Sequence, residues 1–221
     1  QLENLPKIRK IAKNLDFPMA SVIFKMERTG VEINPDFFAE ESQIFGEKIA
    51  KIETEIFELA GTTFNVASPL QLSKVLFEDL ALPTKGIKKS RTGFSTGQKE
   101  LDKLRGLHPI IEKIEQFREF SKLKNTYIDT LPKLADEQNR IHSTFHQDVT
   151  STGRLSSTNP NLQNIPIRSE LGRKLRAGFV PKEGNILIAA DYSQFELRLA
   201  AVMAGDQKLI EDFRSGAYIH L

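Results

Sequence analysis

Two long amphipathic helical patterns constrain the fold of this chain most strongly. In the first pattern, apolar side chains recur from Phe38 to Leu59 at intervals of seven, four, three, four and three residues. The second pattern runs from Ile110 to about Leu134. Spacings of three and four residues place side chains on one face of an α-helix. Residues 31–134 therefore predict an elongated, mostly helical hairpin.

Shorter signals subdivide the rest of this region. A helical segment is expected over residues 5–29, and Val31–Ile33 is typical of a short extended piece. Gly61 follows the first long pattern and is expected to cap that helix at its C-terminus. Ser68 followed by Pro69 is a typical helix start, with an N-cap residue and then proline in the first turn.

The two halves of the hairpin are joined by residues 83–97, which are rich in Pro, Gly, Lys, Ser and Thr and predict an exposed, mobile tip. This tip carries a basic group formed by Lys85, Lys88, Lys89 and Arg91. A second basic group lies further along the chain, at Arg168, Arg173, Lys174 and Arg176. Such groups can hold phosphates through charge and counterion release. The alternative, solvated loops that aid solubility, remains open for either group.

The pattern changes after the hairpin. Ile141–Val149 suggests a strand, and residues 150–169 are rich in Ser, Thr, Asn, Pro and Gly. A loop of that length is usually either functional or disordered. Residues 186–190 form a short apolar run that predicts a buried strand, which ends at Asp191. An amphipathic helix is expected from Phe195 onward.

Composition excludes several classes of protein. The chain has no cysteine, which excludes disulfides, thiol catalysis and zinc–thiolate sites. No stretch approaches the roughly 20 apolar residues of a membrane helix, and the first ten residues, QLENLPKIRK, lack the apolar core of a signal peptide. We therefore expect a cytoplasmic protein. The net charge of +2 does not by itself indicate a nucleic-acid partner.

Asp191 is the first residue that suggests chemistry. A carboxylate at the C-terminal end of a strand lies at the rim of a sheet, and carboxylate oxygens are ligands that Mg²⁺ prefers. The alternative is an acid that caps the following helix. The position of Asp191 alone favours the cap.

The residues around Asp191 favour the metal ligand over the helix cap. ADYSQFELR, at residues 190–198, closely resembles motif A of the family A DNA polymerases, usually DYSQIELR, with Phe195 in place of the isoleucine. TSTGRLSSTNPNLQNIPIR, at residues 150–168, resembles the family's preceding signature almost word for word. Shorter segments resemble its thumb and palm: FNVASPLQLSKVLFE (64–78), KLKNTYIDTLP (122–132) and HQDVT (146–150). The resemblance covers essentially the whole chain in the family's order.

The resemblance implies an α+β fold, in which a helical thumb precedes part of a palm built round an antiparallel sheet. Residues 1–30 would be a leading segment that packs on the palm, residues 31–139 the thumb, and residues 140–221 a partial palm with motif A. The fingers and motif C, with its His-Asp-Glu wording, are missing. No HDE string occurs in the chain.

Motif A also implies roles for particular residues. Asp191 corresponds to the catalytic aspartate that binds both metal ions, and Tyr192 to the residue whose backbone carbonyl is a further ligand. Gln194 and Glu196 would line the sugar of the incoming nucleotide, with Glu196 as the steric gate that crowds a ribose 2′-OH. The alternative for Glu196 is an exposed helix carboxylate. His220 corresponds to a histidine near the triphosphate.

The loop before motif A corresponds to residues that contact DNA. Arg154 matches an arginine at the minor-groove edge of the primer terminus, where purine N3 and pyrimidine O2 accept hydrogen bonds. Further residues near the minor groove and backbone would be Gln163, Asn164 and Arg168. Asn159 and Asn161 could equally be turn formers. In the thumb, backbone phosphates would face Lys85, Lys88 and Lys89.

The implied function is template-directed DNA synthesis, in which deoxynucleotides are added to a primer 3′-OH by nucleotidyl transfer with two Mg²⁺ ions. The implied partners are primer–template DNA, dNTPs and the remainder of the polymerase. Because motif C and the fingers are missing, we expect a truncated product, a crystallised fragment or one part of a split enzyme, inactive alone. No upstream nuclease domain is expected. Near the end of the sequence, Tyr218 occupies a position where the family usually has aspartate.

Two other functions are alternatives to DNA synthesis. A non-catalytic DNA-duplex clamp would keep the thumb and lack turnover, and the downstream reading frame would distinguish it from an enzyme. The related single-subunit RNA polymerases are disfavoured because Glu196 and SQFELR follow the DNA enzymes. Because the resemblance is to bacterial enzymes, we expect this cytoplasmic protein to be associated with the nucleoid.

Overall fold

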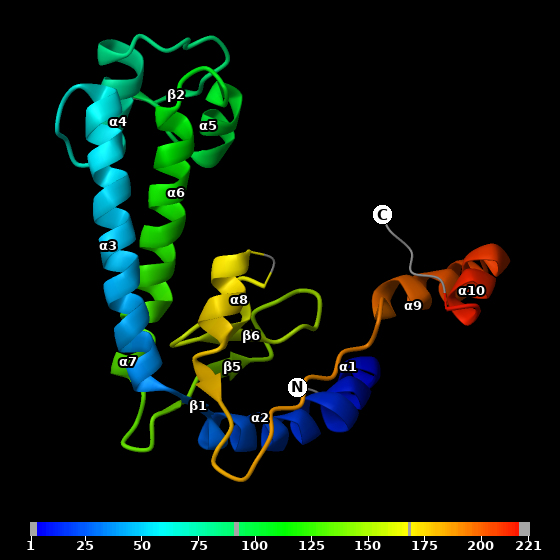
Figure 1. Cartoon of the computed structure of the whole chain (residues 1–221). Coiled ribbons are helices and arrows are strands. Elements are labelled where there is room, and N and C mark those ends of the chain that lie inside the picture. Colours follow the sequence, from blue (N-terminus) through cyan, green and yellow to red (C-terminus); the bar gives the residue numbers. More distant parts are fainter. Residues whose placement is uncertain (1–3, 91–92, 168, 217–221) are drawn as a thin grey trace. The chain divides into compact units, whose positions relative to one another are not determined.

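The computed structural model describes residues 4–90, 93–167 and 169–216 (Figure 1). The chain forms two compact units, residues 1–182 and 183–221. The helices of the first unit are α1 (Pro6–Ile11), η2 (Ala12–Asp16), α2 (Phe17–Thr29), α3 (Pro35–Ala60), α4 (Pro69–Lys74), η3 (Val75–Asp79), α5 (Gln98–Leu104), α6 (Ile110–Leu123), η4 (Lys124–Ile128), α7 (Leu131–Leu134), η5 (Leu162–Asn164) and α8 (Glu170–Arg176). Its strands are β1 (Val31–Ile33), β2 (Lys89–Ser90), β3 (Gly93–Phe94), β4 (Arg140–Ile141), β5 (Thr144–His146), β6 (Ser156–Thr158) and β7 (Phe179–Val180).

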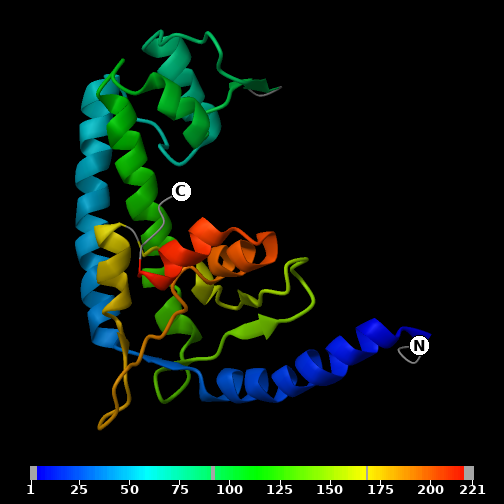
Figure 2. The ribbon, with the colours of Figure 1, turned by 90° about the vertical axis from the view of Figure 1, so that its right-hand side faces the viewer.

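The predicted helical hairpin is present, with α3 and α6 side by side in both views (Figures 1 and 2). Local signals fix the ends of α3. The side chain of Asn34 accepts a hydrogen bond from the amide of Phe37 at 3.1 Å, as an N-cap does. Gly61 follows the helix with φ at 67°, the left-handed conformation of a C-cap glycine. The second predicted helix is divided into α6, η4 and α7.

The end of the hairpin is partly buried in the described residues. Strands β2 and β3 pair, with Lys89 opposite Phe94. Ile87 is 8% exposed and Thr96 4%. Ile87 belongs to a core that includes Leu76 and residues from α3, α4, η3, α5 and α6. The prediction of a wholly exposed tip is therefore wrong at Ile87 and Thr96, because burying an apolar side chain offsets the cost of ordering the loop.

A three-stranded antiparallel sheet lies at the base of the hairpin, in the order β4–β1–β7. Val31 pairs with Ile141, and Ile33 pairs with Phe179. A second core beside this sheet joins side chains from α3, η4 and α8. The ammonium of Lys174 on α8 contacts the carboxylate of Glu41 on α3 at 2.6 Å. The structure thus confirms the α+β class, with helices and small antiparallel sheets.

The N-terminal helical segment formed by α1, η2 and α2 follows the predicted range closely. Its apolar side chains are mostly exposed, and Ile23 is the buried exception on α2. The segment is tied to the strands that follow β4 by hydrogen bonds. The amide of Phe145 donates to the carboxylate of Glu27 at 2.6 Å, and Gln147 donates to the carbonyl of Asp16 at 3.2 Å.

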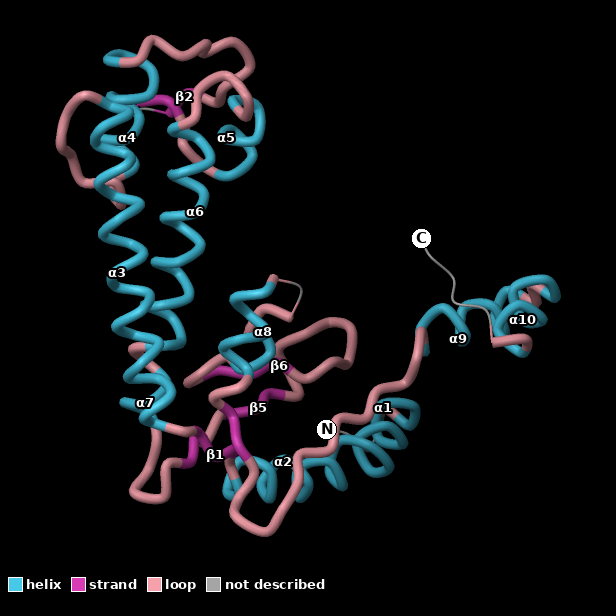
Figure 3. Tube along the Cα trace, viewed as in Figure 1, coloured by secondary structure: helices cyan, strands magenta, loops and turns pink. Residues whose placement is uncertain are grey.

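The helices described in the second unit are α9 (Phe195–Ala204) and α10 (Gln207–Arg214). Residues 183–194 run as irregular chain before them (Figure 3). The prediction of a buried strand at residues 186–190 is therefore wrong: Ile186 is 78% exposed and Ile188 81%. The reason is that a strand needs a hydrogen-bonded neighbour, and no strand in the described part of the chain pairs with this segment.

None of the helices in the described part of the chain combines the length and the apolar character that a bilayer crossing requires.

Candidate functional site

The loop at residues 150–169 holds two of the predicted DNA-contacting residues on a short 3₁₀ turn, η5. The side chain of Asn161 starts this turn by accepting a hydrogen bond from the amide of Gln163 at 3.1 Å. Gln163 in turn donates its side-chain amide to the carbonyl of Leu155 at 3.1 Å. Gln163 and Asn164 are both exposed. Asn159 has a positive φ of 55°, so Asn159 and Asn161 both act in turns here.

Asn164 borders a polar hollow of about 740 Å³. The other side chains around it come from η4, α7, the end of α6 and the loop, and they include Lys122, Thr126, Tyr127 and Asn161. The hydroxyl of Tyr127 donates to the backbone carbonyl of Asn164 at 2.7 Å. The loop is therefore attached to the base of the helical hairpin directly beside this hollow.

Arg154 lies in an exposed turn earlier in the same loop. The hydroxyl of Thr150 donates to the carbonyl of Arg154 at 2.5 Å, and the amide of Arg154 donates to Thr152 at 3.4 Å. These bonds fix the backbone of the turn. Gly153, with φ at 76°, provides the left-handed residue that this turn needs.

The predicted lysines of the thumb, Lys85, Lys88 and Lys89, are all exposed at the end of the hairpin. Lys88 borders a second polar hollow, of about 420 Å³, together with Thr96 and Arg118. The guanidinium of Arg118 donates to the side chain of Thr96 at 3.2 Å and also to its carbonyl. Burial lowers the pKa of Arg118. Sequence analysis did not single out Arg118, because a lone arginine at helical spacing from the buried Ile111 and Ile114 of α6 belongs to no motif.

The motif A residues lie in the second unit, in the turn that leads into α9. Gln194 occupies the N-cap position with a left-handed φ of 53°, and Glu196 is in the first turn of the helix. The alternative that Asp191 caps this helix is wrong, because Asp191 lies three residues before the cap position. Asp191 is exposed, and Tyr192 is 82% exposed with its ring 5.6 Å from that of Phe195.

Arg198 stabilises this turn from within α9. Its guanidinium donates to the carbonyl of Ser193 at 2.8 Å, and it lies 4.7 Å from the centre of the Phe213 ring. Phe213 is the buried residue of α10. The residues that follow Asp191 are therefore held by a cation that is itself fixed against α10.

The structure does not bring all predicted residues together. Arg154, Gln163 and Asn164 share one loop, and the three lysines lie at the far end of the hairpin in the same unit (Figure 1). Arg168 and His220 lie outside the described residues, as does Tyr218. Within the described ranges, no group of three or more His, Cys, Asp or Glu side chains is placed to hold a metal ion.

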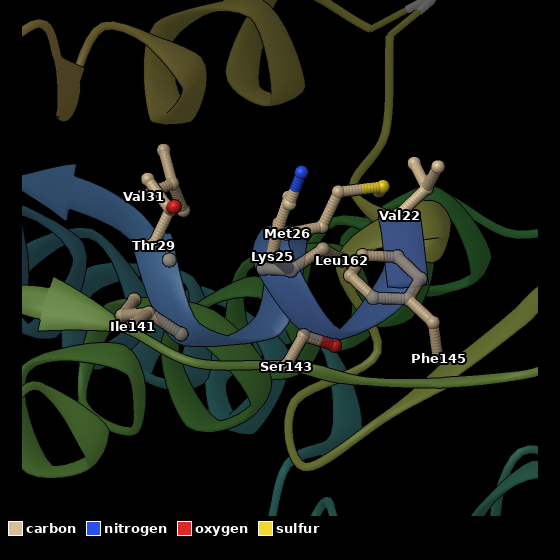
Figure 4. A pocket seen from close by; sticks show the side chains of 10 residues that line it. Val22, Lys25, Met26, Thr29, Val31, Ile141, Ser143, Phe145 and Leu162 are labelled. Atoms are coloured by element: carbon tan, nitrogen blue, oxygen red, sulfur yellow. The ribbon is translucent and has the colours of Figure 1, made fainter. Parts of the chain in front are cut away.

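An apolar pocket of about 470 Å³ contains none of the predicted residues. Its lining comes from α2, β1, β4, β5 and η5 and includes Val22, Met26, Phe145 and Leu162 (Figure 4). Lys25 is the charged side chain at its edge (Figure 4).

Comparison with known proteins places these features in context. Residues 35–221 match the family model described as DNA polymerase family A. The chain is 43% identical over 221 residues to DNA polymerase I of Synechocystis sp., covering 100% of this chain and 22% of that protein. It is 46% identical over 222 residues to the thermostable DNA polymerase I of Thermus aquaticus, covering 100% and 27%. The chain thus spans about a quarter of the length of these relatives.

A solved structure shows the same fold. The POL domain of Pol1 from M. smegmatis, in complex with DNA primer-template and dNTP, is similar with a TM-score of 0.87 and 35% sequence identity. The match covers 99% of this chain and 39% of that one.

Proposed function

The chain belongs to DNA polymerase family A, and from this premise we propose that it supplies the thumb and part of the palm for template-directed DNA synthesis. The complete enzyme adds deoxynucleotides to a primer 3′-OH by two-metal-ion nucleotidyl transfer. Residues 1–30 are the leading segment on the palm, residues 31–139 the thumb and residues 140–221 the partial palm. The observation that carries the proposal is the unbroken match of this chain, over its whole length, to DNA polymerase I relatives.

Asp191 and the backbone carbonyl of Tyr192 are the groups that would hold Mg²⁺. Carboxylate and carbonyl oxygens fit this hard cation, and both residues lie in the exposed turn before α9. They are a partial set, because a two-ion site needs a further carboxylate from the rest of the polymerase. When bound, such ions lower the pKa of the primer hydroxyl and offset charge on the leaving pyrophosphate.

The side chains of Gln194 and Glu196 act on the sugar of the incoming nucleotide. Glu196, in the first turn of α9, excludes a nucleotide that carries a 2′-OH because its side chain occupies the space the hydroxyl needs. His220 acts near the triphosphate. Arg198 keeps the turn in place through its bond to Ser193.

The loop and the thumb hold the primer–template duplex. Arg154, Gln163 and Asn164 donate to the minor-groove acceptors that every base pair presents, which allows binding without reading the sequence, and Arg168 acts beside them. Lys85, Lys88 and Lys89 contact backbone phosphates. This division accounts for the exposure of both groups of side chains.

A chimaeric polymerase tests the catalytic role of this segment. The 221 residues would replace the matching segment of the Thermus aquaticus enzyme, and primer extension would be measured with Mg²⁺ and all four dNTPs. We expect extension by the chimaera, and a loss on the order of 10²–10³-fold in Asp191→Asn, with duplex affinity unchanged. Asp212→Asn on α10 is the matched control and should extend normally. Near-normal extension by Asp191→Asn would contradict the metal-ligand role.

The isolated chain gives the complementary measurement. We expect it to bind a primer–template duplex in fluorescence anisotropy and to extend no primer, because it lacks the second carboxylate and the fingers. Extension by the isolated chain that depends on Asp191 would show that another residue of this chain completes the site.

A further inference from the structure

Tyr127 makes a bond that connects two distant parts of the chain. Its side chain is 4% exposed in η4, and its hydroxyl donates to the carbonyl of Asn164, 37 residues away, at 2.7 Å. Burial raises the pKa of the phenol, so the group keeps its proton, and remains a donor, across the neutral range. The acceptor belongs to the residue whose side chain is expected to face DNA.

Arg176 holds the next two carbonyls from the opposite side. Its guanidinium donates to Ile165 at 3.2 Å and to Pro166 at 3.4 Å. Ile165 itself is buried in the core beside the sheet. Gly172 packs so closely on this segment that an added Cβ would lie 2.5 Å from the carbonyl oxygen of Pro166. Three consecutive carbonyls, at residues 164–166, are thus bound by side chains from two helices.

This arrangement has a consequence for the exposed side chains. Residues 164–166 belong to no strand, so side-chain donors replace the ladder that would otherwise fix the backbone. Once the carbonyl of Asn164 and the side chain of Ile165 are fixed, the direction in which the Asn164 side chain leaves the loop is also fixed. Gln163, one residue earlier, is held on the same turn by its bond to Leu155.

We propose that Tyr127 and Arg176 are positioning residues, which hold residues 162–166 so that Gln163 and Asn164 meet the minor groove of the duplex. This inference rests on the proposed function. Neither residue needs to touch DNA, because each acts through the backbone of the loop. Tyr127 lies far along the hairpin from the thumb lysines, so its proposed role in orienting the loop is separate from phosphate binding.

Tyr127→Phe tests the proposal, because it removes the hydroxyl and keeps the buried ring. In the full 221-residue chain, we expect the Kd for a primer–template duplex to rise about five- to tenfold, which corresponds to about one lost hydrogen bond. The slope of log Kd against log salt should stay the same, because no phosphate contact is removed. The change should also largely disappear in a background that carries both Gln163→Ala and Asn164→Ala, since Tyr127 is proposed to act through these two side chains.

Ser42→Ala is the matched control. It removes a hydrogen bond of equal length, 2.7 Å, from Ser42 to Asp129 just after η4, together with the bond that Ser42 accepts from Lys124, and it does not touch the loop. A purely structural role of Tyr127 would weaken duplex binding equally in Tyr127→Phe and Ser42→Ala, or would weaken it equally with and without the side chains of Gln163 and Asn164. Either result would overturn the proposal. So would unchanged affinity in Tyr127→Phe and Arg176→Gln. A wild-type chain that binds no duplex would instead contradict the proposed function, and the positioning role with it.

Discussion

Gly178 and Gly46 differ in what an added methyl group would meet. At Gly178, in the turn after α8, a Cβ would lie 2.6 Å from the ring of Phe38 and 2.7 Å from that of Phe37. Phe38 is fully buried, so it has no free space to move into. At Gly46, within α3, the nearest atom is 3.7 Å away, on the flexible side chain of Lys124.

The same substitution should therefore have opposite effects at the two glycines. Gly178→Ala should lower the free energy of unfolding by about 1–3 kcal/mol through overpacking. Gly46→Ala should raise it by about 0.5–1 kcal/mol, because alanine is the better helix former. Urea unfolding followed by circular dichroism measures both. Equal effects at the two sites would show that the turn after α8 relaxes away from the phenylalanine rings.

His142 connects three parts of the chain and should make stability depend on pH. Its ring contacts the carboxylate of Asp136 at 3.0 Å and the carbonyl of Glu27 at 2.7 Å. These bonds raise the pKa of His142, with Asp136 as the largest cause, whereas the charge of Arg140, two residues earlier, opposes the shift. The pKa of Asp136 is lowered, first by its bond to His142.

The two shifts define a pH window. The contribution of His142 to the free energy of unfolding is fully present below its ordinary pKa of 6.5 and is lost as the pH rises through the raised pKa. The contribution of Asp136 to the free energy of unfolding is present above its ordinary pKa of 3.8 and is lost as the pH falls through the lowered pKa. The difference in Tm between wild type and His142→Gln should therefore be largest between these two values and shrink above pH 6.5. A difference that grows toward pH 8 would contradict this assignment.

At the scale of elements, the predictions that succeeded rest on local signals. Gly61 marks a helix end by its left-handed φ, and Ser68 marks a helix start by a bond to a residue three positions later, and such local features can be inferred from the sequence. The loop at residues 150–169 was recognised by its composition for the same reason. Its attachment to Tyr127 could not be inferred, because the two partners are 37 residues apart.

The segment at residues 186–190 shows the opposite case. Its apolar run is typical of a buried strand, yet whether a strand forms depends on a neighbour to which it can bond. In the described residues that neighbour is lacking, and the apolar side chains are exposed. Periodicity thus indicated the chemical character of the segment correctly and its conformation wrongly.

The exposed run leads to a prediction about association. Ile186→Thr combined with Ile188→Thr should leave the Tm almost unchanged, since substitutions of exposed side chains usually change stability by no more than about 0.5 kcal/mol each. Self-association at high concentration, measured by light scattering, should fall because an exposed apolar patch is removed. Leu175→Thr, at a side chain that is 3% exposed, is the comparison and should unfold the chain readily. A large loss of Tm in the double variant would mean that the run is buried in solution.

For the molecule as a whole, the division into two compact units predicts where a protease cuts first. Residues 183–194 form an irregular, mostly exposed segment at the start of the second unit. A protease needs several residues of extended chain, and hydrogen-bonded helices provide these only after local unfolding. Glu183 lies in this segment and is exposed, which makes it the preferred site of a glutamate-specific protease.

Glu137 is the closest competitor, since it also lies in an exposed connection. It occupies a turn that the carboxylate of Asp136 closes by accepting from the amides of Gln138 and Arg140 at 2.9 and 2.8 Å. This turn should resist cleavage because its backbone is already bonded. Mass spectrometry of a brief digest should therefore show a fragment that ends at Glu183, and Glu183→Gln should abolish it. Since both cores lie within residues 1–182, the purified fragment should still unfold cooperatively near the Tm of the whole chain. A fragment that loses cooperative unfolding would show that the second unit is needed to stabilise the first.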